Sequence, residues 1–264
     1  MARPIRRLGQ HFLRDSRLLA RIADALGAAP GDTVIEVGPG PGGLTAALAE
    51  RAGRVVALEK DPALARGLAG RWPGVEVVAG DALEADWHAL AGGPFLVAGN
   101  IPYNITSPLL DKALTPPRPA RVVFLVQREV AGRLAAAPGT AAYGALTVGV
   151  QSVAAVERLF AVPAGAFHPP PRVESAVVRL EPLALPLVGD AEVAAFRRTV
   201  VGLFGFRRKQ LLRGLRELTG WEVERAGGAL IAAGVEPTLR PEALAPAEFV
   251  RLHQALVDGG WRDG

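Results

Sequence analysis

TVIEVGPGPGG, residues 33–43, is the stretch of this 264-residue chain that decides its fold. Residues 34–37, which are apolar except for Glu36, predict a strand, and the glycines after it permit a tight turn and close approach of the backbone to a ligand. The apolar periodicity at 44–48 then predicts a helix. Strand, glycine turn and helix in this order match the G-x-G-x-x-G pattern of dinucleotide-binding α/β folds. A purely structural turn is the alternative interpretation of the same residues.

Three further predicted strands lead into a polar side chain: Glu59 after 54–58, Asp81 after 75–78 and Asn100 after 94–99. The carboxyl ends of parallel strands line one crevice of an open sheet, where ligands bind. We therefore expect these side chains to share a pocket with the glycine turn. Glu59 follows that turn by about 20 residues, the spacing at which a carboxylate can accept both hydroxyls of a ribose. Asp81 could accept a hydrogen bond from the amino group of a bound adenine.

The tetrapeptide Asn-Ile-Pro-Tyr at 100–103 predicts a site that methylates an exocyclic amine. The N6 amine of adenine is a weak nucleophile because its lone pair is delocalised into the ring, so acceptors must hold it and aim it at a methyl donor. The side-chain oxygen of Asn100 and the carbonyl of Ile101 can each accept one N6 hydrogen. Pro102 fixes the turn, and Tyr103 offers a stacking face. An ordinary Asn–Pro turn after a strand is the alternative.

Segments in the same order along nearly the whole chain resemble S-adenosylmethionine-dependent methyltransferases. More narrowly, they resemble the ribosomal RNA small-subunit adenine N6,N6-dimethyltransferases of the KsgA/Dim type. The segments are RLGQHFL at 7–13, LVQREV at 125–130, AYG at 142–144, FHPPPRVESAVVRL at 167–180 and FGFRRK at 204–209. The resemblance implies an α/β fold, namely a Rossmann-like class I methyltransferase sheet with a smaller C-terminal α-helical domain.

The resemblance also implies an activity: methyl transfer from S-adenosylmethionine to N6 of two adjacent adenosines in the 3′-terminal hairpin loop of 16S ribosomal RNA, giving N6,N6-dimethyladenosine during small-subunit biogenesis. Tyr103 and Phe167 would stack on the two faces of the target adenine. No obligatory general base is expected, because the proton can leave to water. The residues implied to contact or border the cofactor are His11, Leu13, Gly38, Gly40, Glu59, Asp81, Ala82 and Asn100. His11 stands where the family more often has Asn, and a simple surface histidine is the alternative.

The formal net charge of +4 comes almost wholly from arginine, since the chain has only three lysines. Arginine suits phosphate recognition through its planar fork. One basic region is the N-terminal arm with Arg3, Arg6, Arg7 and Arg14. The other is predicted to bind RNA through Arg207, Arg208, Lys209, Arg213 and Arg216. The last three fall at i, i+4 and i+7, which predicts one basic helix face. A solvated helix face is the alternative; binding to RNA phosphates should weaken with salt.

Composition excludes several other classes. The chain has no cysteine, which excludes disulfides, thiol catalysis and cysteine-ligated zinc, and its four histidines are scattered. No apolar run reaches the roughly 18 residues that could span a bilayer, and no apolar segment follows the basic start as in a signal peptide. We expect a cytoplasmic monomer without a metal or a membrane, whose partner is 16S rRNA in the small ribosomal subunit or its precursor.

Five predicted strands, at 34–37, 54–58, 75–78, 94–99 and 121–126, alternate with helical patterns, as in a parallel sheet with helices on both faces. The resemblance implies that β-rich runs at 145–153 and 175–181 complete the sheet as an antiparallel pair. A proline-rich loop at 161–171 would deliver Phe167 to the cleft. Asp15 and Ser16 could cap a helix that includes Leu18, Leu19, Ile22 and Leu26.

The linker at 181–186 predicts the domain boundary. Residues 1–185 would form the methyltransferase domain and residues 186–264 a helical RNA-binding accessory domain. Helical patterns fall at 191–204, 207–219, 222–233 and 246–257, separated by glycine and proline.

Rival classes explain only parts of the sequence. An NAD-dependent oxidoreductase would share the glycine turn and Glu59 but gives residues 100–103 no role. A DNA adenine or protein glutamine methyltransferase would need neither the Phe167 loop nor the segment at 204–209. In a ribosome-assembly or transcription factor that had lost methylation, the intact site residues would be unexplained. Macrolide-resistance enzymes, which methylate an adenine of 23S RNA, share the elements at 7–13 and 100–103; the segments at 167–180 and 204–209 favour the small-subunit enzyme.

Overall fold

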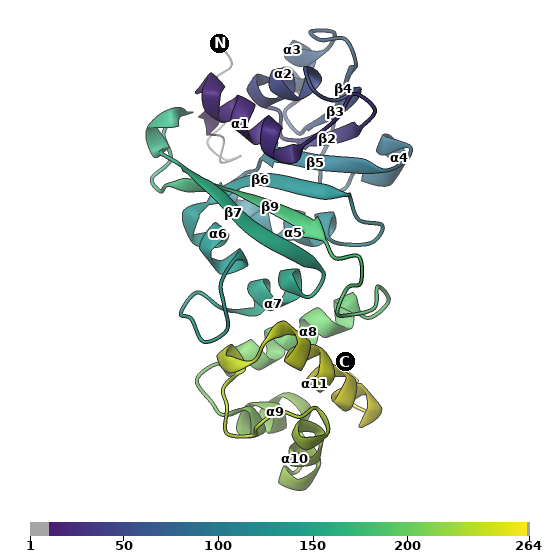
Figure 1. Cartoon of the computed structure of the whole chain (residues 1–264), viewed down its shortest axis with the longest axis vertical. Helices are drawn as coiled ribbons and strands as arrows, with labels where there is room; N and C mark the ends of the chain where they lie inside the picture. The colour runs from purple at the N-terminus through teal and green to yellow at the C-terminus, as the bar shows by residue number, and fades with distance from the viewer. Residues whose placement is uncertain (1–10, 263–264) are drawn as a thin grey trace. The chain divides into compact units, whose positions relative to one another are not determined.

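The computed structural model describes residues 11–262, which form two compact units (Figure 1). The first holds the described residues up to Ala131 together with Val156–Pro182. The second holds Gly132–Ala155 and the described residues from Leu183 onward. The unit boundary after Pro182 falls within the predicted linker, while the functional division at residue 185 stays a prediction. Arg3, Arg6 and Arg7 of the predicted basic arm lie outside the described residues, as do positions 7–10 of the N-terminal element.

A sheet of seven strands, counted over residues 11–262, forms the core of the first unit, in the order β4-β3-β2-β5-β6-β9-β7. The strands are β2 (Thr33–Val37), β3 (Arg54–Glu59), β4 (Val75–Ala79), β5 (Phe95–Asn100), β6 (Arg121–Gln127), β7 (Ala154–Val162) and β9 (Ser175–Pro182). Strands β2 to β6 pair in parallel, and β9 pairs antiparallel with β6. The chain runs outward from β2 to β4 and then returns to β5, so the order reverses between β2 and β5. A ligand crevice is expected at such a switch point.

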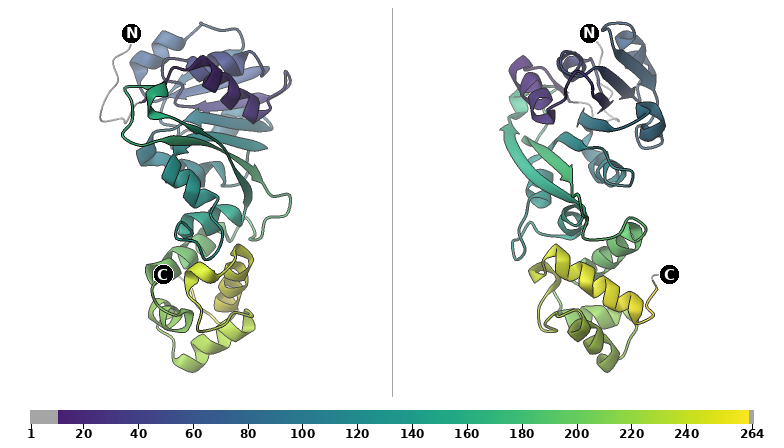
Figure 2. Two further views of the ribbon diagram at one scale, coloured as in Figure 1. Left: turned by 60° about the vertical axis from the view of Figure 1, so that its left-hand side comes forward. Right: turned by 45° about the vertical axis from the view of Figure 1, so that its right-hand side comes forward.

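Helices cover both faces of this sheet (Figure 2), as predicted from the alternation of patterns. In the first unit they are α1 (Ser16–Leu26), α2 (Gly43–Ala49), α3 (Pro62–Leu68), α4 (Trp87–Ala91) and α5 (Thr106–Ala113), with the 3-10 turns η2 (Tyr103–Ile105) and η3 (Ala164–Ala166). Helix α1 begins as predicted, because the Asp15 carboxylate accepts hydrogen bonds from the N–H groups of Arg17 and Leu18. Its face with Leu19, Ile22 and Leu26 is buried in the core.

A second, two-stranded sheet ties the start of the described chain to the proline-rich segment. It pairs β1 (Phe12–Leu13) antiparallel with β8 (Phe167–His168). Arg14 N–H also donates to the carbonyl of Ala166. The segment at 161–171 is therefore not a free loop: it carries η3 and β8, and its position is fixed by β1.

The second unit consists mainly of helices: α7 (Ala145–Gln151), α8 (Val193–Gly205), α9 (Leu211–Thr219), α10 (Val223–Ala232), η4 (Pro241–Ala243) and α11 (Pro246–Asp258). Helix α6 (Arg128–Leu134) joins the two units. The predicted strand at 145–153 is wrong, because this stretch forms α7 and the strand β7 follows it. The predicted basic helix face is wrong in one respect: α9 begins at Leu211, so Lys209 precedes the helix.

Tyr143 is a buried residue of the second unit. Its side chain is fully buried, and its hydroxyl donates to the carbonyl of Leu244 at 2.7 Å. Replacing Tyr143 by phenylalanine should lower the free energy of unfolding by about 1–3 kcal/mol, because the carbonyl loses its partner. Urea unfolding followed by circular dichroism checks this. An unchanged midpoint would mean that the hydrogen bond adds nothing to stability.

Candidate active site

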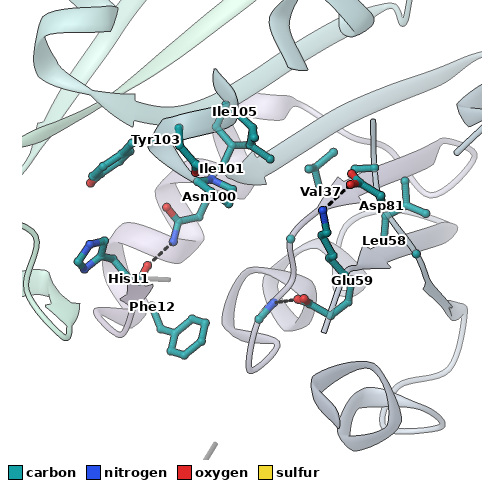
Figure 3. Close-up of a pocket in the computed structure, with 17 residues that line it drawn as sticks. His11, Phe12, Val37, Leu58, Glu59, Asp81, Asn100, Ile101, Tyr103 and Ile105 are labelled. Carbon is teal, nitrogen blue, oxygen red and sulfur yellow. Dashed lines mark hydrogen bonds and ion pairs between the residues drawn. The ribbon is translucent and has the colours of Figure 1, made fainter. Parts of the chain in front are cut away.

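A cavity opens at the carboxyl ends of the strands on both sides of the switch point (Figure 3). Most of the predicted site residues line it: His11, Gly38, Gly40, Glu59, Asp81, Ala82, Asn100, Ile101, Pro102 and Tyr103. They come from the residue before β1, from the turn after β2, from the ends of β3 and β5, and from the segments that follow β4 and β5. The prediction that four strand ends share one pocket is thus confirmed in space.

The glycine turn needs its glycines. Gly38 and Gly40 have φ of 68° and 57°, in the left-handed region that side chains rarely adopt. A Cβ on Gly40 would lie 2.9 Å from the ring of Phe12, which packs over the turn. Sequence analysis missed Phe12, although it lies between two residues that were predicted to border the cofactor.

Glu59 is the buried acid of the cavity, with 4% of its surface exposed. Its Oε2 accepts from Gly40 N–H at 3.0 Å and its Oε1 from Asp61 N–H at 2.8 Å. Burial raises the pKa of Glu59, and these two hydrogen bonds oppose the rise. Each carboxylate oxygen retains a lone pair. Glu59 can therefore hold the glycine turn and still accept a pair of hydroxyls from a ligand.

Asp81 carries the second negative charge of the cavity. Its Oδ2 lies 2.6 Å from Lys60 Nζ, and its Oδ1 accepts from Leu83 N–H at 2.9 Å. The hydrogen bond from Lys60, with that from Leu83, lowers the pKa of Asp81. Asp81 is thus an ionised acceptor beside Ala82 at the edge of the cavity. Lys60, which directly follows Glu59, also lines the cavity and was missed from the sequence.

Asn100 ends β5 with its amide held in one orientation. Its Nδ2 donates to the main-chain carbonyl of His11 at 2.8 Å. A carbonyl can only accept, so this bond fixes which end of the amide is nitrogen and leaves Oδ1 as an acceptor without a partner among residues 11–262. Gly99 brings β5 close to β2, because a Cβ there would lie 2.6 Å from the carbonyl oxygen of Val37. Sequence analysis predicted the role of Asn100 but not these two supports.

Tyr103 is half-buried beside Asn100. Its hydroxyl lies 2.6 Å from Ser175 Oγ on β9, and burial raises the pKa of Tyr103. Its ring lies parallel to the imidazole of His11 to within 23°, with 5.9 Å between the ring centroids. His11 Nδ1 lies 2.8 Å from the carbonyl oxygen of Pro169.

Leu13 and Phe167 do not line the cavity. Their side chains are 6% and 4% exposed and belong to the apolar core, together with Leu19 and Ile22 of α1. The two residues face each other in the β1–β8 pair. Phe167 would have to leave the core to meet a base. Its predicted stacking on adenine stays a prediction.

The predicted RNA-binding side chains lie in the second unit, and several are paired with acids. Arg207 binds Glu242 at 2.8 Å and also donates to the carbonyls of Thr140 and Ala141. Lys209 and Arg213 share Glu217, whose pKa the hydrogen bond from Lys209 lowers. Arg208 is exposed. The other predicted residue, Arg216, lies 4.0 Å from Glu222.

Two negative findings hold for the described part of the chain. Residues 11–262 contain no group of three or more His, Cys, Asp or Glu side chains that could hold a metal ion. Over the same residues, no helix combines the length and the apolar character needed to cross a bilayer.

Comparison with known proteins gives consistent results. The family model described as ribosomal RNA adenine dimethylase matches residues 3–256. The chain is similar to ribosomal RNA small subunit methyltransferase A of Phenylobacterium zucineum, with 45% identity over 254 residues, 94% of this chain and 87% of the relative. The protein of that name from Geobacter metallireducens is 43% identical over 259 residues, 95% of this chain and 94% of the relative.

Solved structures agree. The 23S rRNA methyltransferase ErmE is 33% identical with a TM-score of 0.72, and the match covers 93% of this chain and 99% of that one. A dimethyladenosine transferase from Plasmodium falciparum is 24% identical with a TM-score of 0.83, covering 95% of this chain and 99% of that one, which shows a shared fold.

Proposed function

This chain belongs to the ribosomal RNA adenine dimethylase family, and we propose that it transfers methyl groups from S-adenosylmethionine to N6 of two adjacent adenosines in the 3′-terminal hairpin loop of 16S ribosomal RNA. The product is N6,N6-dimethyladenosine. Similarity to relatives named ribosomal RNA small subunit methyltransferase A supports this choice of subunit. The observation that carries the proposal is the held amide of Asn100, whose free oxygen faces the cavity that also contains Glu59 and Asp81.

The cavity fits S-adenosylmethionine. When bound, this cofactor supplies an electrophilic methyl group on a sulfonium. Glu59 would accept the two ribose hydroxyls, since both of its oxygens keep a lone pair, and Asp81 would accept from the adenine amino group. Gly38 and Gly40 have no side chains, which lets the backbone of the turn approach the ligand at these two positions.

The chain's own residues supply orientation rather than acid–base chemistry. Asn100 Oδ1 and the carbonyl of Ile101 would accept the two hydrogens of the target amine and point its lone pair at the methyl group. Both oxygens interact more strongly as positive charge develops on the amine, so they stabilise the transition state more than the ground state. Pro102, with φ of −59°, fixes the turn that places Ile101. Tyr103 would stack on the extruded base.

Primer extension tests the proposal. Small ribosomal subunits that lack the two methylations are incubated with the chain and S-adenosylmethionine, and reverse transcription is run through the 3′-terminal hairpin. Dimethylated adenine cannot pair through its N6 edge, so we expect a strong stop at the two adjacent adenosines that depends on the donor. Methylated particles serve as the positive control. Absence of the stop would refute the proposed substrate.

A second candidate is methylation of an adenine in 23S ribosomal RNA. The similarity to ErmE, at 33% identity, favours keeping it as the alternative. The same primer extension on large-subunit RNA distinguishes the two, because a stop there and none in 16S RNA would select the alternative.

We further propose that the helical domain from residue 186 onward binds RNA, and that the chain acts in the cytoplasm as a monomer on the small subunit or its precursor. The contrast between Arg208, which is exposed, and Arg207, which is paired with Glu242, allows this RNA site to be tested. Arg208 is exposed, so Arg208→Ala should weaken RNA binding a few-fold and reduce the salt slope by about 1. Arg207 holds Glu242 and two carbonyls, so Arg207→Ala should mainly lower the melting temperature.

The control for this RNA site removes an acid instead of a base. Glu217→Gln releases Lys209 and Arg213 from their shared partner and should tighten RNA binding at low salt. Filter binding from 50 to 300 mM salt measures all three variants, and identical salt slopes would contradict an RNA-binding role for this segment.

A further inference from the structure

We propose that a basic surface of the first unit, formed by the start of α1 and the end of β7, binds the phosphate backbone of the RNA that carries the target base. We call it the α1–β7 surface, and its members are Arg14, Arg17, Arg21, Arg158 and Phe160. The choice of RNA rests on the proposed function. The surface lies outside the cavity, and its RNA contacts would not depend on the predicted RNA-binding residues of the second unit.

The four arginines of the α1–β7 surface have no carboxylate partner. All four are exposed, and none forms an ion pair with an acid among residues 11–262. Arg54 and Arg121, on strands of the same sheet, are in contrast paired with Glu76 and Glu181. A guanidinium without an acid keeps its N–H donors available, and two of them can bind one phosphate side by side.

The acids of α1 and β7 do not offset this charge, because each already has a partner outside the surface. Asp24 on α1 binds Arg51 at 2.8 Å, and Glu157 on β7 binds Arg179 of β9. Asp15 precedes α1, and its carboxylate caps the helix. The surface is therefore left with more positive than negative charge, which attracts a polyanion.

The stability of α1 does not explain the arginines either. Arg17 and Arg21 are four residues apart and thus lie on one face of the helix, where like charges repel each other. This face is opposite to the one that buries Leu19 and Ile22 in the core. Neither arginine has an acid to relieve the repulsion, so a ligand that binds both is the remaining source of favourable interaction.

The arginines of the two elements lie on the same side of the sheet. Arg158 and Phe160 are two residues apart on β7, so their side chains point to the same face of the strand. The guanidinium of Arg21 lies over the ring of Phe160, with its Cζ 3.9 Å from the ring centroid. Both views of Figure 2 show α1 beside β7. Arg158 therefore faces the side of the sheet that α1 covers.

The contact with Phe160 orients Arg21 for a phosphate. The N–H donors of a guanidinium lie in its plane, so stacking on an aromatic ring restricts the group and leaves the donors free. Arg17 lies one turn earlier, about 6 Å away along the helix axis, which lets the two side chains contact neighbouring phosphates of one strand.

The α1–β7 surface begins beside the cavity. Arg14 follows shortly after the cavity residue His11, and its N–H group donates to the carbonyl of Ala166. This hydrogen bond fixes the main chain between the cavity and α1. An RNA strand whose target base enters the cavity would thus have its adjacent phosphates within reach of Arg14 and then of Arg17.

The surface suits a nucleic acid better than a protein. Large apolar side chains are exposed elsewhere among residues 11–262, for example Leu185, Val201 and Ile231, but none of them lies on α1 or β7. The energetically important centre of a protein interface is usually apolar or aromatic. Binding to RNA phosphates depends instead on arginine and lysine.

The salt dependence of RNA binding tests the proposal. A triple variant with Arg17→Gln, Arg21→Gln and Arg158→Gln removes three charges and keeps polar side chains. Filter binding from about 50 to about 300 mM salt gives its Kd for small ribosomal subunits that lack the two methylations and for protein-free 16S RNA. Melting temperatures and the calorimetric Kd of S-adenosylmethionine show whether the variant is folded.

We expect the slope of log Kd against log salt concentration to fall by about 2 to 3 in the triple variant, because each lost phosphate contact changes the slope by about 1. Arg21→Gln alone should lower it by about 1, and Arg21→Lys, which keeps the charge, should leave it unaltered. Phe160→Leu should weaken binding a few-fold at an unchanged slope, because Arg21 keeps its charge but loses its orientation.

Arg66→Gln is the matched control. Arg66 on α3 is also exposed and has no carboxylate partner among residues 11–262. Helix α3 packs against β3 and β4, at the opposite edge of the sheet from β7. We expect the salt slope of Arg66→Gln to equal that of the unmodified chain.

Two results would overturn the α1–β7 surface: an unchanged slope in the folded triple variant, or an equal change of slope in Arg66→Gln and Arg21→Gln. Weaker binding to the particles with unchanged binding to 16S RNA would overturn it too, since the surface would then contact a ribosomal protein. Absence of the donor-dependent stop with the unmodified chain would refute the proposed function, while the slopes on 16S RNA would still decide whether this surface binds RNA. A normal stop together with unchanged slopes would refute only the surface.

Discussion

Replacement of Asn100 by alanine is expected to lower kcat for methyl transfer by about 100- to 1000-fold, the usual loss when one preorganised hydrogen-bonding group is removed from an active site. The oxygen of Asn100 has its position fixed before substrate arrives, because Nδ2 is bound to the His11 carbonyl. Its bond to the amine strengthens as positive charge develops, so the loss should fall on turnover. Single-turnover methylation of small-subunit particles measures it.

Asn100→Gln is the companion variant. It keeps the amide but moves it by one methylene, so we expect a loss close to that of alanine if position matters more than polarity. The Kd of S-adenosylmethionine should change by less than about 10-fold in both, because Glu59 and Asp81 are untouched. Unchanged turnover in Asn100→Ala would remove Asn100 from the chemistry. A large loss of donor affinity with normal turnover would place it in the cofactor site only.

The central sheet could be predicted because its signals are local. Runs such as 34–37 and 54–58 are apolar except for Glu36 and Arg54, as expected for strands that are largely buried on both faces, and each is followed by a glycine or an acid. The topology then brings Glu59, Asp81 and Asn100 to one edge, since parallel strands share a direction. The resemblance to the family then predicted the target base and the cofactor.

The prediction of a strand at 145–153 was wrong because the composition of this stretch is typical of strands. Ala145–Gln151 reads ALTVGVQ, with β-branched residues and a glycine, yet it forms α7. Thr147 Oγ1 accepts from Gly144 N–H and donates to the Arg133 carbonyl, which stabilises the first turn. Thr147, Val148 and Val150 are all buried, so packing in the second unit overrides the preference for a strand. No local signal reports that packing.

Two contacts of the site that could not be predicted from the sequence join residues far apart in the chain. The His11 carbonyl holds Asn100, 89 positions away, and Ser175 Oγ holds the hydroxyl of Tyr103, 72 positions away. Every residue has a main-chain oxygen, so the first contact cannot be predicted from residue types in a single sequence. The family pattern suggested Phe167 as a stacking residue, but the β1–β8 pair turns its side chain into the core.

Replacement of Glu59 by glutamine is expected to weaken S-adenosylmethionine binding by about 100-fold. A carboxylate can accept from Gly40 N–H, from Asp61 N–H and from two ribose hydroxyls, whereas glutamine has one oxygen and must turn its NH2 group toward one of these donors. Hydrogen bonds to a charged group contribute about 1.5–3 kcal/mol each, so the loss of one or two accounts for this factor. Calorimetry at pH 8 measures the Kd. Asp24→Asn, which changes an exposed acid on α1, should leave the Kd unaltered.

The pH dependence of donor binding follows from the raised pKa of Glu59. Because burial favours the protonated carboxyl, Glu59 becomes ionised at a higher pH than an ordinary carboxyl, and donor affinity should rise as pH increases through that raised pKa. The stability of the unliganded protein should change in the opposite direction and fall as pH increases. Its stability from this group is fully present below the ordinary pKa of 4.5 and is lost as pH rises through the raised value, since a buried carboxylate is then charged.

Glu36 affects the pH dependence of stability but not the pH dependence of donor binding. Burial raises the pKa of Glu36 to about 8, and it does not line the cavity, so it adds its own loss of stability at high pH in every variant. In Glu59→Gln, the free energy of unfolding should therefore still fall near pH 8 because of Glu36, but the fall caused by Glu59 should be absent. The Kd of the donor should become nearly independent of pH in this variant. Calorimetric titrations from pH 5 to 9 on both proteins compare these slopes. Equal pH dependence of Kd in the two proteins would show that Glu59 does not bind the donor as a carboxylate.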